Sequence, residues 1–188
     1  IQISTDYVFN GDHGPYFEED PVDPISVYGK SKLDAEKYLI DSNVSHTIIR
    51  ANVLYSYAFK TKASFLKWVV ESLKDSKSIN VVSDQWNNPT STISLAKFIN
   101  RVALLEIFGL YNYADKGIMS RFEFAKLIAN VFNLDSDLIN PILTSELNQV
   151  AKRPKKSGLR TQKIENELSI HPPNVKESLE SLNDNLRL

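Results

Sequence analysis

The fold of this chain is decided by its first fifty residues, which begin with IQISTDYVF at positions 1–9. Apolar and β-branched residues dominate this run and the polar turn Asn10-Gly11 closes it, so it predicts a buried strand. Apolar positions interleaved with charge predict a helix over 26–40, and a β-branched run over 44–50 predicts the next strand. A strand, a helix and a strand in this order indicate a right-handed βαβ unit in a parallel sheet.

Helices and strands alternate up to about residue 131, as expected for an α/β protein, and the chain is then loop-rich up to about Thr161. Ser120, followed three residues later by Glu123, is a capping box and marks the start of a helix. We expect helices over 63–73, 92–105, 120–131, 161–168 and 175–186, and strands over 79–82 and 109–114.

The composition of the 188 residues excludes several classes of protein. A hydrophobic content of 42% is enough for a sizeable core, and a net charge of −1 argues against nucleic-acid binding. The absence of cysteine excludes disulfides and thiolate sites, and favours the cytoplasm. His13, His46 and His171 lie too far apart to predict a metal site. No apolar run reaches the length of a membrane span.

The chain opens inside its first strand, at Ile1 rather than at a methionine. We therefore expect further sequence to precede it. Two charged clusters are interpreted as solvated loops, the acidic run Glu18-Glu19-Asp20 and the basic run over 152–156.

Tyr28 and Lys32 point to chemistry, because a spacing of four places them on one face of the predicted helix. A free tyrosine side chain has a pKa of about 10, and a lysine one turn away stabilises the phenolate. Tyr28 can then donate a proton to a carbonyl oxygen as hydride reaches its carbon, while Lys32 can reach the hydroxyls of a cofactor ribose. The hydroxyl of Thr5, at the carboxyl end of the neighbouring strand, would complete a polar cup for that oxygen.

The pattern Tyr-x-x-x-Lys is common by chance, and its non-functional interpretation is an amphipathic tyrosine on a surface helix. Its position adds weight, because the helix follows a strand that ends in Thr5-Asp6. The active-site interpretation therefore depends on these residues meeting in one cleft.

Several further motifs are spread over nearly the whole chain. They are Ser4-Thr5-Asp6-Tyr7-Val8-Phe9-Asn10-Gly11, Pro15-Tyr16, Tyr28-Gly29-Lys30-Ser31-Lys32-Leu33 with Glu36, Asp84-Gln85-Trp86 with Pro89-Thr90, and Arg153-Pro154 with Ser157 and Leu159. Together they closely resemble the dTDP-4-dehydrorhamnose reductase family, a branch of the extended short-chain dehydrogenases/reductases. The regulatory β subunit of methionine adenosyltransferase belongs to the same family.

The resemblance implies a role for each matching residue. Tyr28 matches the proton donor, and Lys32 matches its partner on the nicotinamide ribose of NADPH or NADH. Thr5 matches the hydroxyl that tunes the tyrosine and touches the sugar. Asp6 and Tyr7 fall where the family contacts its substrate, a nucleotide sugar.

Two more positions complete the implied substrate site, Val53 and Arg153. In the reductases the segment after Arg50 usually continues Thr-Ser-Trp, and the tryptophan lies against the sugar. Here it reads Ala51-Asn52-Val53, so Val53 takes the tryptophan position. This departure weakens the case for dTDP-4-dehydrorhamnose as the specific substrate.

The resemblance also implies a division of the chain. Residues 1–52 and 92–115 would be the second half of a doubly wound Rossmann sheet, which binds NAD(P). Residues 53–91 and 116–188 would form a smaller α/β substrate-binding lobe, with the active site between the two. The glycine-rich turn that holds the cofactor pyrophosphate in this family does not occur in the sequence.

The function implied is NAD(P)H-dependent reduction of a 4-keto sugar nucleotide, with two alternatives. One is a non-catalytic regulatory subunit like that of methionine adenosyltransferase, and the other is a sugar-nucleotide epimerase or dehydratase of the same superfamily. The partners expected are a nucleotide-sugar substrate and at most a second copy in a homodimer, with no nucleic acid and no membrane.

Overall fold

The computed structural model describes residues 1–57, 64–147 and 149–186. It confirms the α/β class with parallel strands. Within the described ranges no helix has the length and apolar character needed to cross a bilayer. The strands are β1 (Gln2–Thr5), β2 (Thr47–Ala51), β3 (Leu54–Tyr55), β4 (Ile79–Val82), β5 (Trp86–Asn87), β6 (Thr90–Ser91), β7 (Gly109–Tyr113), β8 (Met119–Ser120) and β9 (Ile139–Ile142). The helices are α1 (Val27–Ile40), α2 (Phe65–Lys74), α3 (Thr92–Leu104), α4 (Arg121–Val131), α5 (Gln162–Leu168) and α6 (Val175–Leu186), with short 3-10 turns η1 (Asp6–Val8), η2 (Ser136–Leu138) and η3 (Thr144–Glu146).

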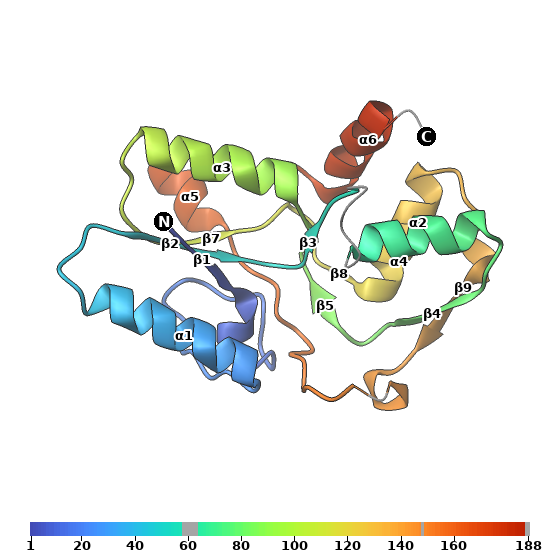
Figure 1. The fold of residues 1–188 in the computed structure, drawn as a ribbon, viewed down its shortest axis with the longest axis horizontal. Helices are drawn as coiled ribbons and strands as arrows, with labels where there is room; N and C mark the ends of the chain where they lie inside the picture. Colours follow the sequence, from blue (N-terminus) through green and yellow to red (C-terminus); the bar gives the residue numbers. More distant parts are fainter. Residues whose placement is uncertain (58–63, 148, 187–188) are drawn as a thin grey trace.

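The main sheet contains three parallel strands in the order β1-β2-β7. Helix α1 covers one of its faces, and α3 and α5 cover the other (Figure 1). The core between the sheet and α3 includes the stacked rings of Phe98 and Tyr113, whose centroids lie 4.6 Å apart. Because parallel strands end at the same edge, the residues that follow Thr5 and Ala51 meet there.

The first strand ends at Thr5 and is therefore shorter than predicted. The hydroxyl oxygen of Thr5 accepts a hydrogen bond from the backbone N–H of Tyr7 at 3.2 Å and caps the turn η1. A side chain that bonds nearby backbone in this way competes with the hydrogen bonds of a sheet. The prediction of one continuous strand over 1–9 is therefore wrong beyond Thr5.

A second core lies among α2, α4 and α6, next to β4 and β9 (Figure 1). The predicted capping box at the start of α4 is confirmed: the Ser120 hydroxyl accepts from the N–H of Glu123, and the Glu123 carboxylate accepts from that of Ser120. Strand β9, which pairs in parallel with β4, was not predicted. It contains Pro141, a residue that argues against a strand when sequence alone is considered.

Helix α5 packs on the sheet rather than with the second core. Ile164 is fully buried against β7 and the apolar face of α3. The division expected from the sequence assigns residues 116–188, and with them α5, to the substrate-binding lobe. The position of α5 on the sheet does not agree with that assignment. The remaining domain boundaries stay a prediction.

Helix α1 is joined to the sheet by a buried ion pair. Arg50 Nη2 of β2 lies 2.7 Å from Glu36 Oε2, and both side chains are almost completely buried. The Ser4 hydroxyl of β1 also donates to the Glu36 carboxylate. The Arg50 guanidinium lies 5.1 Å from the ring centroid of Phe9 and donates to the carbonyl oxygen of Glu18 at 3.0 Å. One carboxylate thus connects the helix with two strands.

The acidic run Glu18-Glu19-Asp20 was predicted to be a solvated loop, and this prediction is wrong for Glu18. Glu18 is buried, and its carboxylate accepts a hydrogen bond from the backbone N–H of Asn112 in β7 at 2.8 Å. Burial raises the pKa of Glu18 above its ordinary value. The prediction holds for Glu19, which is exposed.

We expect Arg50→Met to destabilise the fold by about 3–5 kcal/mol, because it leaves the Glu36 carboxylate buried without its cation. Urea unfolding at neutral pH measures the change. Lys77→Met is the matched control, since Lys77 pairs with Asp75 at 2.8 Å in an exposed position and should have no measurable effect. Equal effects of the two substitutions would contradict the structural role given to Glu36 and Arg50.

Candidate active site

Helix α1 starts directly against the turn η1, and this contact brings its first residues to the sheet edge. The Ser26 hydroxyl caps the helix by accepting from the N–H of Gly29 at 3.1 Å. A Cβ atom at Gly29 would overlap the carbonyl oxygen of Tyr7, so the close approach requires glycine. The rings of Tyr7 and Tyr28 then meet edge to face, with centroids 5.9 Å apart.

Thr5, Tyr28 and Lys32 line one cavity of about 300 Å³ at this edge. The Lys32 ammonium donates to the carbonyl oxygen of Ile3 at 2.8 Å, so its side chain lies along β1. Tyr28 is 52% exposed, which leaves its phenol open to a ligand and to solvent. The structure therefore brings together the three residues with predicted catalytic roles, and the roles themselves stay a prediction.

The Thr5 hydroxyl is already engaged on both sides. It accepts from the N–H of Tyr7 and donates to Asp6 Oδ1 at 3.1 Å. Its proton points to Asp6 and not to the open cavity. To donate to a substrate oxygen, Thr5 would have to give up its bond to Asp6.

Asp6 is the most unusual acid of the site. It lines the cavity and is 2% exposed, and its Oδ2 makes no hydrogen bond within the described ranges. Burial raises the pKa of Asp6 to about 7, against the opposing effects of the Ser157 and Thr5 hydroxyls and the charge of Arg121. The described part of the chain contains no group of three or more metal-ligating acids or histidines.

Val53 lines the same cavity, at the point where the chain leaves β2 for the second core. Its φ of 29° is in the left-handed region, where β-branched residues are rare. The backbone N–H of Thr90 donates to the Val53 carbonyl at 3.0 Å and holds this turn. The structure thus places the predicted substrate residue at the cavity wall in a strained conformation.

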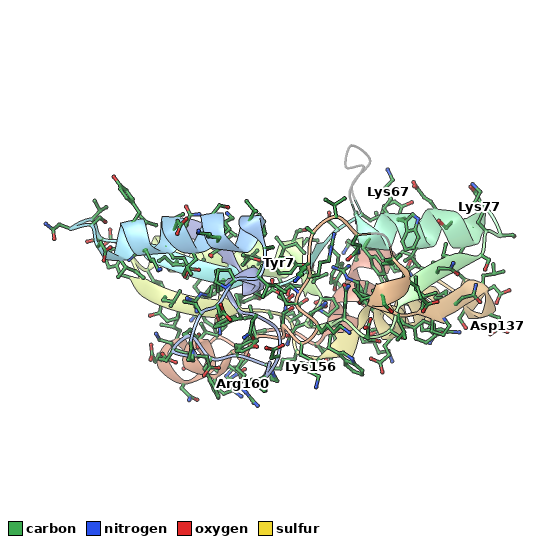
Figure 2. The ribbon with its side chains drawn as sticks, turned by 90° about the horizontal axis from the view of Figure 1, so that it is seen from below. Tyr7, Lys67, Lys77, Asp137, Lys156 and Arg160 are labelled. Atoms are coloured by element: carbon green, nitrogen blue, oxygen red, sulfur yellow. The ribbon has the colours of Figure 1, made fainter. Side chains whose placement is uncertain are left out.

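Arg153 lines a second cavity of about 600 Å³, which shares Tyr7 and Tyr28 with the first. Figure 2 shows Tyr7 near the middle of the molecule, between the α1 end and the α2 end. The predicted substrate residues Asp6, Tyr7, Val53 and Arg153 therefore surround two adjoining cavities.

The segment that follows Arg153 is fixed by backbone hydrogen bonds to both ends of the molecule. The N–H of Lys156 donates to the Gly11 carbonyl at 2.8 Å, and the N–H of Trp86 donates to the Lys155 carbonyl at 2.6 Å. Trp86 itself lies outside both cavities, because it lines a separate hollow of about 220 Å³. Trp86 pairs with Ser120 across β5 and β8, so it lies beside the start of α4 without lining either cavity.

Sequence reasoning missed Arg121, which lines the cavity with Tyr28 and Lys32. Burial lowers the pKa of Arg121, and the nearby charge of Arg153 contributes to the same effect. A signal for it exists in the sequence, because Arg121 directly follows the helix cap Ser120. The first turn of a helix favours acids over bases, so a cation there needs another explanation.

Comparison with known proteins identifies related sequences along the whole chain. The family model described as RmlD substrate binding domain matches residues 1–188. The chain is 35% identical over 171 residues to methionine adenosyltransferase 2 subunit beta of Rattus norvegicus, covering 88% of the chain and 51% of that protein. It is 33% identical over 193 residues to dTDP-4-dehydrorhamnose reductase of Sinorhizobium fredii, covering 97% of the chain and 64% of that protein.

A solved structure shows the same fold. The dTDP-4-dehydrorhamnose reductase of Bacillus anthracis, in complex with NADP, superposes with a TM-score of 0.89 at 32% sequence identity. The match covers 98% of this chain and 64% of that one. The chain thus spans between 51% and 64% of the length of these three proteins.

We expect the stability of the fold to fall as the pH rises from about 4 to about 7, because Asp6 ionises near 3.8 when unfolded and near 7 when folded. In that window the folded state holds the extra proton, and the loss reaches up to about 4 kcal/mol above pH 7. Asp6→Asn cannot ionise, so it should flatten this dependence. Urea unfolding between pH 4.5 and pH 8, at roughly half-unit steps, measures it.

Asp34→Asn is the control for this experiment, because Asp34 is an exposed carboxylate on α1. It should leave the pH dependence as in the wild type. The same slope in Asp6→Asn and in the wild type would show that Asp6 does not titrate as described.

Proposed function

The chain belongs to the family of RmlD substrate-binding domains, and from this premise we propose that it supplies the proton donor and the substrate site of an NAD(P)H-dependent reductase. The substrate class is a 4-keto sugar nucleotide. The shared cavity of Thr5, Tyr28 and Lys32 carries this proposal. Relatives that are dTDP-4-dehydrorhamnose reductases, one of them solved with NADP, support the reaction class.

In this proposal Tyr28 donates a proton to the carbonyl oxygen of the bound sugar. Its phenol is half-exposed in the cavity, so it can meet the substrate and later recover a proton from water. The ammonium of Lys32 lies in the same cavity and stabilises the phenolate that remains. General acid catalysis of this kind contributes roughly 10²- to 10⁴-fold in rate.

The residues of the cavity fit the nicotinamide end of NADPH or NADH. Lys32 offers donors for ribose hydroxyls if it releases the Ile3 carbonyl, to which it is bonded at 2.8 Å. The cofactor, when bound, supplies the hydride. The residues of this chain that fit the cofactor lie on its nicotinamide side, and the 188 residues contain no glycine-rich turn for a pyrophosphate.

A second candidate is a non-catalytic subunit, which the similarity to methionine adenosyltransferase 2 subunit beta favours. Val53 adds support, because the reductases usually carry a sugar-contacting tryptophan at this position. An epimerase or dehydratase is a third candidate. Such enzymes do not consume NADPH overall, whereas a reductase oxidises one NADPH for each sugar reduced, so the stoichiometry of NADPH oxidation separates these classes.

We expect Tyr28→Phe to lower the turnover of a 4-keto sugar nucleotide by about 100-fold or more in the full-length protein, because the ring remains but the proton donor is lost. KM should change little. The absorbance of NADPH follows the reaction. Tyr38→Phe, on the same helix and 78% exposed, is the matched control and should turn over like the wild type.

Unchanged turnover in Tyr28→Phe would remove this tyrosine from the mechanism. A wild-type protein that binds the sugar nucleotide and NADPH, but oxidises no NADPH, would instead favour the subunit.

A further inference from the structure

Residues 149–153, here called the cavity segment, run along the larger of the two adjoining cavities. Four of them line this cavity of about 600 Å³: Val150, Ala151, Lys152 and Arg153. All residues of the segment are exposed, so no buried side chain anchors it in a core. Among the described residues, none at positions 150–153 forms a hydrogen bond or an ion pair. The course of the segment is therefore set by the residues that flank it.

A single carboxylate, that of Asp84, bonds the chain on both sides of the cavity segment. Before the segment, Asp84 Oδ1 accepts from the backbone N–H of Thr144 at 2.8 Å and from its hydroxyl at 2.6 Å. After the segment, the Lys155 ammonium lies 2.9 Å from Asp84 Oδ2. Partial burial alone would raise the pKa of Asp84, but the hydrogen bonds from Thr144 and Lys155 outweigh it and lower the pKa. The carboxylate is therefore charged at neutral pH.

The two residues after Asp84 strengthen both anchors. The side-chain amide of Gln85 donates to the Thr144 hydroxyl oxygen at 3.0 Å. The backbone N–H of Trp86 donates to the Lys155 carbonyl at 2.6 Å. Asp84, Gln85 and Trp86 line neither of the two adjoining cavities. A contact with a ligand in these cavities therefore does not explain their arrangement, whereas their bonds to the chain around the cavity segment do.

The anchors act locally. The Lys155 side chain is 62% exposed and that of Asp84 is 22% exposed, and ion pairs in such positions contribute little to the stability of a whole fold. Hydrogen bonds from Thr144 to a charged acceptor are stronger, and they fix the chain where it leaves the turn η3. Loss of Asp84 should therefore free the cavity segment without unfolding the protein.

We propose that Asp84 is a positioning residue of the substrate site, which holds the cavity segment along the larger cavity by binding Thr144 on one side and Lys155 on the other. This inference rests on the proposed function, since it takes that cavity as part of the sugar-nucleotide site. Asp84 acts through the segment and not on the ligand. A segment that is already ordered before the ligand arrives lowers the entropic cost of binding.

Steady-state kinetics of the full-length protein, with a 4-keto sugar nucleotide and NADPH varied in turn, test the proposal. Asp84→Ala removes both anchors and should raise the KM for the sugar nucleotide roughly 10-fold, the scale of a hydrogen bond to a charged group. The kcat and the KM for NADPH should change less than about twofold, because Tyr28 and Lys32 are held on α1. Asp84→Asn keeps an acceptor for Thr144 and should have a smaller effect.

Lys155→Met removes only the second anchor and should raise the same KM by up to about fivefold. Added to Asp84→Ala it should have no further effect, because both substitutions remove one interaction. Asp75→Asn is the matched control. Asp75 also pairs with a lysine, Lys77, at 2.8 Å, but in an exposed position that lines neither cavity, so its KM values should be those of the wild type.

Trypsin cleavage after Lys152 gives a second readout, which does not depend on activity. A protease cuts a segment only when that segment opens from its place in the folded protein. Asp84→Ala should be cut after Lys152 roughly tenfold faster than the wild type, with nearly the same melting temperature. Asp75→Asn should be cut like the wild type. Mass spectrometry of the fragments identifies the cleavage site.

The proposal is overturned if trypsin cuts Asp84→Ala after Lys152 no faster than the wild type, if this variant lowers kcat at an unchanged KM, or if Asp75→Asn has the same effects. A wild-type protein that oxidises no NADPH would refute the reductase instead, and the cleavage rate then decides on Asp84 alone. If Asp84→Ala does not fold, Asp84→Asn and Lys155→Met replace it in both measurements.

Discussion

The buried ion pair between Glu36 and Arg50 determines where the candidate site lies. Tyr28, Lys32 and Glu36 follow one another at intervals of four, so they share one face of α1. Arg50 in β2 and Ser4 in β1 both hold the last of them. Tyr28 and Lys32 are thereby held at the edge of the sheet. Sliding or rotating the helix would separate two buried charges, which costs far more than breaking an exposed pair.

The opposite wall of the site depends on a different constraint, the backbone hydrogen bonds of the segment after Arg153. This segment bonds to Gly11 on the sheet side and to Trp86 on the side of the second core. The side-chain amide of Asn52 also donates to the Ser157 carbonyl at 3.0 Å, directly beneath the exit of β2. Because Lys155 and Lys156 are held from both sides, the chain directly after Arg153 has a fixed course, and Arg153 lines the same cavity as Tyr7.

Local patterns in the sequence predicted the helices and the meeting of Tyr28 with Lys32, because a spacing of four fixes both on one helix face. They did not predict the end of β1 at Thr5 or the burial of Glu18, which depend on a side-chain hydrogen bond and on Asn112, a residue far along the chain. Arg121 was missed for the same reason. The local sequence marks Arg121 as a base directly after the helix cap Ser120, but its place in the cavity follows from how α4 packs against the rest of the molecule.

The two walls of the site carry different groups. The α1 wall carries Tyr28 and Lys32, which donate and balance a proton in the proposed function, whereas Arg121 and Arg153 of the other segments carry fixed positive charge. Their supports are also separate, since an ion pair holds one and backbone bonds and aromatic contacts hold the other. Ligand binding can therefore persist when proton transfer is lost. The chain is similar both to a reductase and to a subunit of another enzyme, and separate supports allow one wall to be kept where the chemistry of the other is not used.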